Sequence, residues 1–222
     1  MDTRTTIKTL GSRAEVDMAM DLLADQIPDV LRSHIGYDGE RTTRACATFL
    51  RRVVAPTIGA DDAVMIPHIW IGAYDGDELV GATHASAQTD VAASHIRMHG
   101  HGNEGAGTLP WIHRLLNVAA SIEEIAVMPS SRGRGVGHSL LNAVHSRLRE
   151  HQLPGSWDDN DRTVRTWAST SAHPLFKSAG YSIAAPREVP PPEYVGGAPM
   201  LWDAQYDDRD GAYCYGFLSD LS

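Results

Sequence analysis

Residues 121–150 limit the possible folds of this chain more than any other stretch of its sequence. An apolar run at 125–128 ends at Pro129, and the glycine-rich residues 132–137 follow it. Beyond them, apolar residues recur close to every 3.6 positions, which indicates an amphipathic helix. The segment therefore predicts a strand, a tight turn and a helix in that order, as in proteins whose sheet is flanked by helices.

The turn between this strand and helix has the features of an anion site. The first N–H groups of a helix have no partner inside the helix, and the helix dipole favours negative charge there. Glycine lets the backbone approach a ligand closely, because it has no Cβ. Arg132 and Arg134 add positive charge in the same turn. We therefore expect a phosphorylated ligand.

The spacing of the glycines separates three kinds of phosphate-binding loop. A Walker-type loop needs Gly-Lys-Ser/Thr, which is missing here, and a dinucleotide fingerprint needs G-x-G-x-x-G rather than glycines at 133, 135 and 137. The third pattern is Arg/Gln-x-x-Gly-x-Gly after a strand that ends in Val-x-Pro. Arg132, Gly135 and Gly137 fit it, as do Val127 and Pro129. The alternative is an ordinary glycine-rich connection between a strand and a helix.

This third pattern closely resembles the coenzyme A-binding motif of the GNAT superfamily of N-acetyltransferases. A second segment, STSAHPLFKSAGY at 169–181, is similar to a later motif of that family through Ala172, Gly180 and Tyr181. Ser169 stands at the usual asparagine, and Phe176 stands at a tyrosine that commonly reprotonates the departing thiolate. The resemblance covers about residues 66–185.

The resemblance implies an α/β fold, a single GNAT-like domain over residues 1–222 with a mixed, mostly antiparallel sheet flanked by helices. Its cofactor core would span about 66–185, and C-terminal strands and a proline-rich loop would follow at 186–222. Acetyl-CoA is the implied co-substrate. The residues expected to contact it are Ile125, Ala126, Val127, Arg132, Gly133, Arg134, Gly135, Val136, Gly137, His138, Ser169 and Phe176.

Acetyl transfer to an amine needs a group that removes a proton. An alkylammonium with a pKa near 10.4 is mostly protonated at neutral pH, and a carboxylate can accept that proton. Glu123 and Glu124 lie in the strand that leads to the turn. Because neighbouring strand residues face opposite sides, we expect only one of them to face the acceptor. The resemblance favours Glu123; a surface role for both is the alternative.

Two further steps of the reaction involve the strand end and the second motif. By resemblance, the backbone N–H of Val127 would stabilise the oxyanion that develops on the thioester carbonyl. Phe176 cannot donate a proton, so solvent is expected to protonate the leaving thiolate. Ser169 and His173 are weaker candidates for that acid. The usual acid of the family is therefore missing from its expected position.

Composition limits the cellular locations and the binding partners that we expect for this protein. A formal charge of −9 disfavours nucleic acid and suits a cationic amine acceptor. No apolar run is long enough to cross a membrane, and the first ten residues lack the core of a signal peptide, so a cytoplasmic location is expected. No metal is expected from the two cysteines. His95, His99 and His101, with Glu104, could form a zinc site or a solvated loop.

The predicted function is acetyl transfer to a primary amine of a small cationic molecule, by direct attack in a ternary complex. Two alternatives remain: acetylation of protein N-termini or lysines, and a non-catalytic acyl-CoA-binding sensor. A homodimer and a monomer are both compatible with the sequence.

The expected helices are a helix capped by Ser12 and Glu15 and closed by Pro28, one at 43–55, one at 109–117, one over the end of 121–150 and one from Pro174. The expected strands are 5–10, 67–74, 78–88, the start of 121–150, 162–170, 181–189, 199–205 and 212–218, with a long loop at 89–107.

Overall fold

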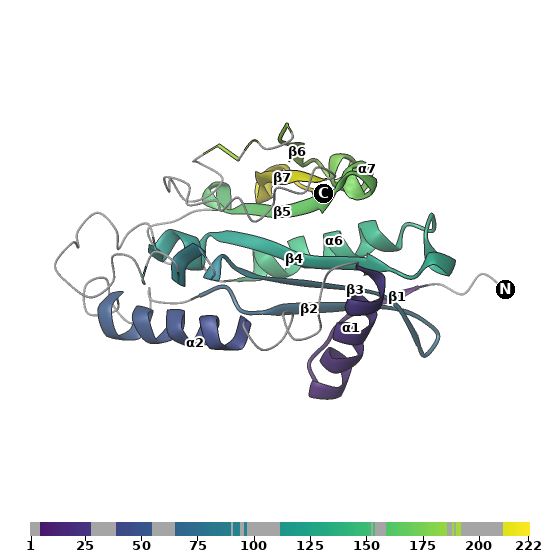
Figure 1. The fold of residues 1–222 in the computed structure, drawn as a ribbon, viewed down its shortest axis with the longest axis horizontal. Helices are drawn as coiled ribbons and strands as arrows, with labels where there is room; N and C mark the ends of the chain where they lie inside the picture. The colour runs from purple at the N-terminus through teal and green to yellow at the C-terminus, as the bar shows by residue number, and fades with distance from the viewer. Residues whose placement is uncertain are drawn as a thin grey trace.

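The computed structural model describes residues 5–27, 39–54, 65–89, 91–93, 96, 112–151, 153, 159–185, 188, 190–191 and 211–222. Its strands form one seven-stranded sheet in the order β1-β2-β3-β4-β5-β7-β6 (Figure 1). The strands are β1 (Thr6–Thr9), β2 (Ile69–Asp75), β3 (Glu78–Ala87), β4 (Ala119–Val127), β5 (Thr163–Ser169), β6 (Ser182–Ile183) and β7 (Gly211–Phe217). The main helices are α1 (Arg13–Gln26), α2 (Gly39–Phe49), α6 (Val136–Glu150) and α7 (His173–Ser178).

The sheet is mixed and mostly antiparallel, as the sequence predicts. Neighbouring strands pair antiparallel except β4 and β5, which are parallel. Residues 119–121 of β4 pair with residues 163–165 of β5, and no later pair joins these two strands in the part of the chain that the structure describes. The sheet is therefore split beyond Ser121, with β1–β4 on one side of the split and β5–β7 on the other (Figure 1).

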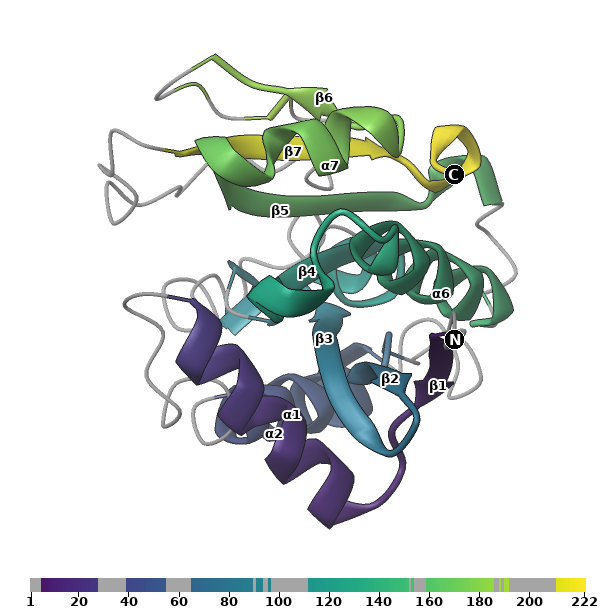
Figure 2. The same ribbon diagram turned by 90° about the vertical axis from the view of Figure 1, so that its right-hand side faces the viewer.

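Helices cover both faces of the first half of the sheet. Ala82 of β3 and Ala126 of β4 pack in a buried cluster with α1. The neighbouring residue Gly81 faces α6, because a Cβ there would lie 3.2 Å from side-chain atoms of Val136 and Leu140. Since successive strand residues face opposite sides, α1 and α6 lie on opposite faces (Figure 2).

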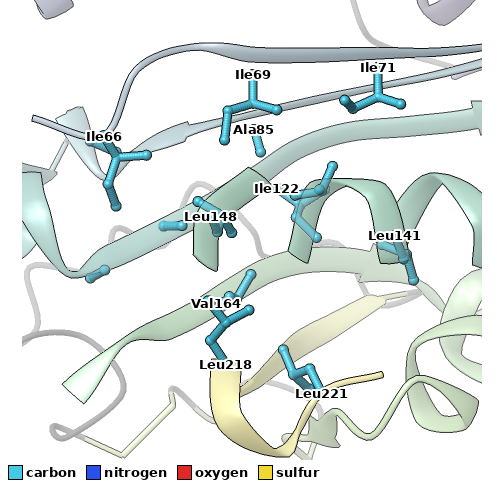
Figure 3. Close-up of a cluster of buried hydrophobic side chains, with 14 of the residues drawn as sticks. Ile66, Ile69, Ile71, Ala85, Ile122, Leu141, Leu148, Val164, Leu218 and Leu221 are labelled. Atoms are coloured by element: carbon cyan, nitrogen blue, oxygen red, sulfur yellow. The ribbon is translucent and has the colours of Figure 1, made fainter. Parts of the chain in front are cut away.

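One cluster of buried side chains joins the two halves of the sheet (Figure 3). It contains Ile122 of β4, Leu141 and Leu148 of α6, and Val164 of β5. Each is at most 2 % exposed, and burial of one such side chain contributes roughly 1.5–3 kcal/mol. This packing holds the halves together where the strands no longer pair.

Local sequence patterns predicted most of the helices and strands correctly. The capping box is present: Ser12 accepts a hydrogen bond from the N–H of Glu15, and Glu15 accepts one from the N–H of Ser12. The β2–β3 turn is Gly76-Asp77, with Gly76 at φ 63°. Helix α7 starts beside Pro174, and Gly180 follows it at φ 96°.

Other boundaries were wrong. Helix α2 begins at Gly39, before the expected 43, because its polar first turn carries no apolar signal, and it ends in a π-helical turn at Leu50–Val54. Strand β6 has two residues instead of nine. Residues 89, 91–93 and 96 are helical inside the expected loop, and residues 112–117 are helical as expected. The rest of that loop and the predicted strand at 199–205 lie outside the described residues. Among the described residues, every helix is too short or too polar to cross a bilayer.

Candidate active site

The turn between β4 and α6 forms an open cradle. Gly133 and Gly135 have φ of 74° and 79°, the left-handed region that favours glycine. A Cβ added to either glycine would meet no atom within 4 Å among the described residues. Gly135 also caps the N-terminus of α6, where backbone N–H groups point outward. The turn therefore has room and donors for a phosphate group.

The two arginines of the turn attach it to its neighbours. Arg132 donates from Nε to the carbonyl oxygen of Val127 at 3.0 Å and from Nη2 to Oε1 of Gln26 in α1 at 3.4 Å. Arg134 forms an ion pair with Asp75 at the β2–β3 turn, with 2.9 Å between Nη1 and Oδ2. Both side chains thus hold the turn in place besides adding positive charge.

The start of α6 combines packing with the predicted ligand contacts. The side chain of Val136 is 3 % exposed and belongs to the core. A Cβ at Gly137 would lie 3.2 Å from Cδ2 of Leu175, so Gly137 lets α6 approach α7. His138 shares a hydrogen bond of 2.6 Å with the Ser178 hydroxyl. Val136 and Gly137 can therefore meet a ligand through their backbone only.

The free edge of β4 faces the split in the sheet. The Met128 N–H donates to the Val80 carbonyl oxygen at 2.9 Å, and the Glu124 carbonyl oxygen accepts from the Thr83 hydroxyl at 2.9 Å, so the backbones of residues 124 and 128 point toward β3. Alternate residues present their backbone groups to opposite edges. The N–H groups of Ile125 and Val127 therefore point toward the β5 side.

A β-bulge in β4 decides how the two glutamates face. His84 of β3 pairs with Glu124, whereas the next residue, Ala85, pairs with Ile122, so Glu123 is an extra residue in the strand. Glu124 contacts His84 and Glu123 contacts Ser86, which is two residues further along β3 and on the same face. Glu123 and Glu124 therefore lie on the same face of β4, because the bulge interrupts the alternation from which we expected opposite faces.

Glu124 lies at one end of a row of hydrogen bonds. Its Oε2 is 3.0 Å from Nδ1 of His84, and Nε2 of His84 is 2.8 Å from Nδ1 of His68. Nε2 of His68 is 2.7 Å from the Thr43 hydroxyl. The row joins β4, β3, the residue preceding β2, and α2.

Burial and stacking fix the middle of this row. The Trp70 ring stacks on His84, with centroids 4.1 Å apart and an angle of 8° between the planes. His84 is 4 % exposed, and burial lowers its pKa to about 4, although the Glu123 carboxylate acts in the opposite direction. His84 is therefore a neutral imidazole at physiological pH. The side chain of Glu124 is 15 % exposed and that of His84 is 5 % exposed.

The second motif lies in β5 and α7. Ser169 is exposed at the end of β5 and shares a hydrogen bond of 2.9 Å with Ser171. Phe176 is 1 % exposed, and its ring meets that of Tyr181 edge to face at 5.3 Å. Phe176 thus packs in the core in this structure.

A groove of about 380 Å³ lies between α1 and the β2–β3 turn. It adjoins the turn between β4 and α6, residues 128–135, which we call the cofactor turn. Four carboxylates line the groove, together with Met18, Leu22, Gln26, Leu79 and Met128. The carboxylates are those of Asp21, Asp25, Asp77 and Glu78. The groove therefore carries negative charge close to the turn.

The possible zinc ligands His95, His99, His101 and Glu104 lie outside the described residues. Among the residues that the structure describes, no group of three or more histidine, cysteine or acidic side chains could hold a metal ion.

The chain belongs to the acetyltransferase (GNAT) family, whose model matches residues 57–181, more than half of its length. The enzyme is thus an acyltransferase, as the sequence predicts. No curated protein matches the chain.

Three solved structures are similar over almost the whole chain. A GNAT-family protein from Desulfovibrio desulfuricans is 11 % identical, with 97 % of this chain and 99 % of that chain covered and a TM-score of 0.49. A GNAT family acetyltransferase from Elizabethkingia anophelis, with acetyl-CoA bound, is 13 % identical, with 97 % and 98 % covered and a TM-score of 0.48. Ard1 from Thermoplasma volcanium is 14 % identical, with 96 % of each chain covered and a TM-score of 0.48.

Sequence reasoning missed Thr43, His68 and His84. The signal that could have found His84 is a histidine inside the stretch 79–87, which is otherwise apolar or small. Its partners are 16 and 40 residues away along the chain, so only the strand register brings them together.

Proposed function

We propose that this enzyme transfers the acetyl group of acetyl-CoA to a primary amine of a small cationic molecule, by direct attack in a ternary complex. The observation that carries this proposal is the position of two carboxylates on one face of β4, Glu123 four residues and Glu124 three residues before Val127, whose N–H points toward the split in the sheet. One short segment thus supplies both a proton acceptor and a hydrogen-bond donor for the oxyanion.

Two parts of acetyl-CoA have matching places, one in the turn between β4 and α6 and one in the split between β4 and β5. Its pyrophosphate would be bound at residues 133–138, where Gly133 and Gly135 leave open space and the N-terminus of α6 offers N–H donors. The extended arm of the co-substrate can add to the open edge of β4 as an extra strand would. Ile125 and Val127 supply the backbone groups for that pairing.

Glu124 is the better candidate for the base, although the resemblance favoured Glu123. Glu124 has His84 at 3.0 Å, whereas Glu123 is exposed and has the Ser86 hydroxyl at 3.2 Å. A partly buried, hydrogen-bonded carboxylate is held in one position, which general-base catalysis requires. Glu123, beside it, would attract the substrate ammonium.

The reaction then needs few protein groups. Glu124 takes a proton from the ammonium, and the neutral nitrogen attacks the thioester carbonyl. The Val127 N–H stabilises the oxyanion of the tetrahedral intermediate. When this intermediate collapses, the C–S bond breaks with its electrons on sulfur, and the nitrogen loses its second proton to solvent, which leaves the neutral amide. Because Phe176 is buried and carries no hydroxyl, solvent protonates the thiolate.

A cationic acceptor suits the charge of the protein. The formal charge is −9, and the groove beside the cofactor turn is lined by four carboxylates. A surface of this sign raises the local concentration of cations. Protein N-termini and lysines stay the second acceptor class.

The test measures thiol release from acetyl-CoA with a panel of polyamines, amino sugars, amino-acid amides and lysine peptides. We expect a small polycationic amine to give the highest kcat/KM. Glu124→Gln should lower kcat by roughly 10²-fold and Glu123→Gln by less, with acetyl-CoA affinity unchanged in both. Equal turnover of peptides and small amines would overturn the small-molecule assignment, and full activity of Glu124→Gln would overturn the assignment of the base.

A further inference from the structure

We propose that His68 and Thr43 are positioning residues that keep Glu124 in the state of a base, because they determine which nitrogen of His84 carries its proton. The inference rests on the proposed function, since it takes Glu124 as the group that accepts the proton of the substrate. It gives roles to two residues that lie outside both cofactor-binding segments and act on Glu124 through His84.

The contact between Glu124 and His84 is compatible with two arrangements of protons. In the first, Glu124 is ionised and its Oε2 accepts a hydrogen bond from Nδ1 of His84, 3.0 Å away. In the second, His84 carries its proton on Nε2, and a protonated Glu124 donates to the bare Nδ1. The heavy atoms have the same positions in both arrangements, but only the ionised carboxylate can take a proton from an ammonium.

The other nitrogen of His84 decides between the two arrangements. Nε2 of His84 is 2.8 Å from Nδ1 of His68. If Nδ1 of His68 donates, Nε2 of His84 accepts and carries no proton, so the proton of a neutral His84 is on Nδ1 and points at Glu124. If the bond runs the other way, His84 has no donor left for Glu124. The tautomer of His68 therefore sets the state of the base.

Thr43 supplies the first donor of the row. Its hydroxyl, on α2, is 2.7 Å from Nε2 of His68, and when it donates there the proton of a neutral His68 is on Nδ1. All three hydrogen bonds then point toward Glu124. This direction is favoured because the row ends on a charged acceptor, and such hydrogen bonds are stronger than those between neutral groups. The tautomers are assigned from this network.

The ring geometry supports hydrogen bonds along the row. The His68 and His84 rings are inclined by only 12°, and their centroids are 5.1 Å apart while the two nitrogens are 2.8 Å apart. The centroid separation exceeds the nitrogen separation by about two ring radii, so the rings meet edge to edge in nearly one plane. The N–H of one ring therefore points at the lone pair of the other, and Trp70 stacks on His84 and keeps its ring in this plane.

Burial makes the placement of a single proton matter. His84 is 4 % exposed, and burial lowers its pKa to about 4, although the Glu123 carboxylate acts in the opposite direction. A doubly protonated His84 would donate to Glu124 whatever its other neighbour did. A neutral His84 has one proton, and His68 determines where it lies.

The same direction helps Glu124 to recover its charge after each turnover. Once Glu124 has taken a proton from the substrate, Nδ1 of His84 still carries its own proton and offers no lone pair. The new proton is therefore not held between the two side chains, and it can pass to solvent when the product leaves.

The test replaces the outer residues, because His84 is buried and its replacement can unfold the protein. Leucine and asparagine have nearly the same shape, so His68→Leu removes the donor to His84, whereas His68→Asn keeps an amide N–H near the position of Nδ1. Thr43→Val removes the hydroxyl without changing the shape of the side chain, and Thr43→Ser keeps the hydroxyl.

Two residues outside the row provide matched controls. His151→Leu is the control for His68, since His151 is also partly exposed and follows α6. Thr48→Val is the control for Thr43, since Thr48 also lies on α2 but donates its hydroxyl to the backbone of Arg44.

We expect His68→Leu to lower kcat about tenfold, which is part of the 10²-fold or more that a general base contributes, with the KM for acetyl-CoA unchanged. His68→Asn should recover most of this loss, although it lacks the imidazole as well. Thr43→Val should show a smaller decrease, which Thr43→Ser recovers. The two control variants should keep the parental kcat.

NMR of the parent protein with isotope-labelled histidine nitrogens observes the tautomers directly. His84 and His68 should both carry their proton on Nδ1, and His68→Leu should change the signals of His84. A proton on Nε2 of His84 in the parent would overturn the proposal even if the variants did not fold.

Failure of this inference and failure of the proposed function can be told apart. If Glu124→Gln keeps full turnover, the base assignment is wrong and the positioning role falls with it. If Glu124→Gln is impaired but His68→Leu has the parental kcat, or His68→Asn loses as much as His68→Leu, the proposed base stands and the role of His68 is overturned. A parental kcat in Thr43→Val would overturn the role of Thr43.

Discussion

Gly135 and Gly137 are two residues apart in the cofactor turn, yet they have different reasons to be glycine. Gly135 is left-handed and borders open space, whereas Gly137 lies against Leu175. Gly135→Val should raise the dissociation constant of acetyl-CoA at least tenfold, since a branched side chain in that backbone region costs about 1–3 kcal/mol and occupies the cradle. Gly137→Val should mainly lower Tm. Calorimetric titration and thermal unfolding of both variants measure the two effects.

Gly76→Val is a control for strain alone, because Gly76 is left-handed in the β2–β3 turn and a Cβ there also meets open space. It should lower stability and leave the affinity for acetyl-CoA unchanged. If Gly135→Val bound acetyl-CoA as tightly as the parent does, the turn at Gly135 would not be the binding site.

The sequence predicted the glutamate pair but not its orientation. Glu123 and Glu124 are adjacent, and strand alternation argued for opposite faces. One extra residue in β4 changed that, and a bulge leaves no clear mark in a single strand's sequence. His68 and His84 could not be predicted for a related reason, because their contact depends on the register of β2 against β3. The burial of Phe176 could not be predicted either, because it depends on packing against Tyr181 in the folded chain.

Among the elements, α1 carries a charge-dependent cap that can be titrated. Hydrogen bonds from Lys8, first of all, and then from Ser12 and Gly11 lower the pKa of Glu15 from 4.5 to about 2. A pKa lowered by folding stabilises the protein above the unfolded value and loses that effect as pH falls through the folded value. The stability difference between the parent and Glu15→Gln should therefore be constant above about pH 5 and shrink from pH 4.5 toward 2.

Chemical denaturation at a series of pH values measures this difference. Lys8→Gln is the control: it removes the largest cause of the shift, so the stability difference should be smaller and its loss should be complete at a higher pH. A difference that stays constant down to pH 2 would contradict the charged cap.

Elements with a strong local signal were predicted well, and those fixed by distant contacts were not. β4 and α6 follow from a proline, glycines and a helical apolar repeat. The polar first turn of α2 gave no such repeat. β6 pairs only with β7 over two residues, and no pattern in 181–189 indicates where that pairing stops.

At the scale of the molecule, net charge should govern how fast a cationic acceptor arrives. The chain carries −9, and the Debye length falls from about 30 Å at 0.01 M salt to about 10 Å at 0.1 M. We expect kcat/KM for a dicationic amine to fall several-fold over that range, while kcat is unchanged. Steady-state rates in increasing NaCl measure it.

An acceptor of similar size with a compensating carboxylate serves as the control, and its kcat/KM should vary little with salt. If both acceptors respond equally, salt acts on acetyl-CoA binding and the steering argument fails.

The bulge also affects which changes this active site can tolerate over evolutionary time. Substitution of Glu123 removes one carboxylate and leaves the strand register as it is. Deletion of the same residue removes the bulge, so the side chains at one end of β4 must switch to the opposite face of the sheet. Either Ile122 leaves the core, or Glu124 and Ala126 leave the face that carries His84 and α1. The length of β4 is therefore under tighter constraint than the identity of its bulged residue.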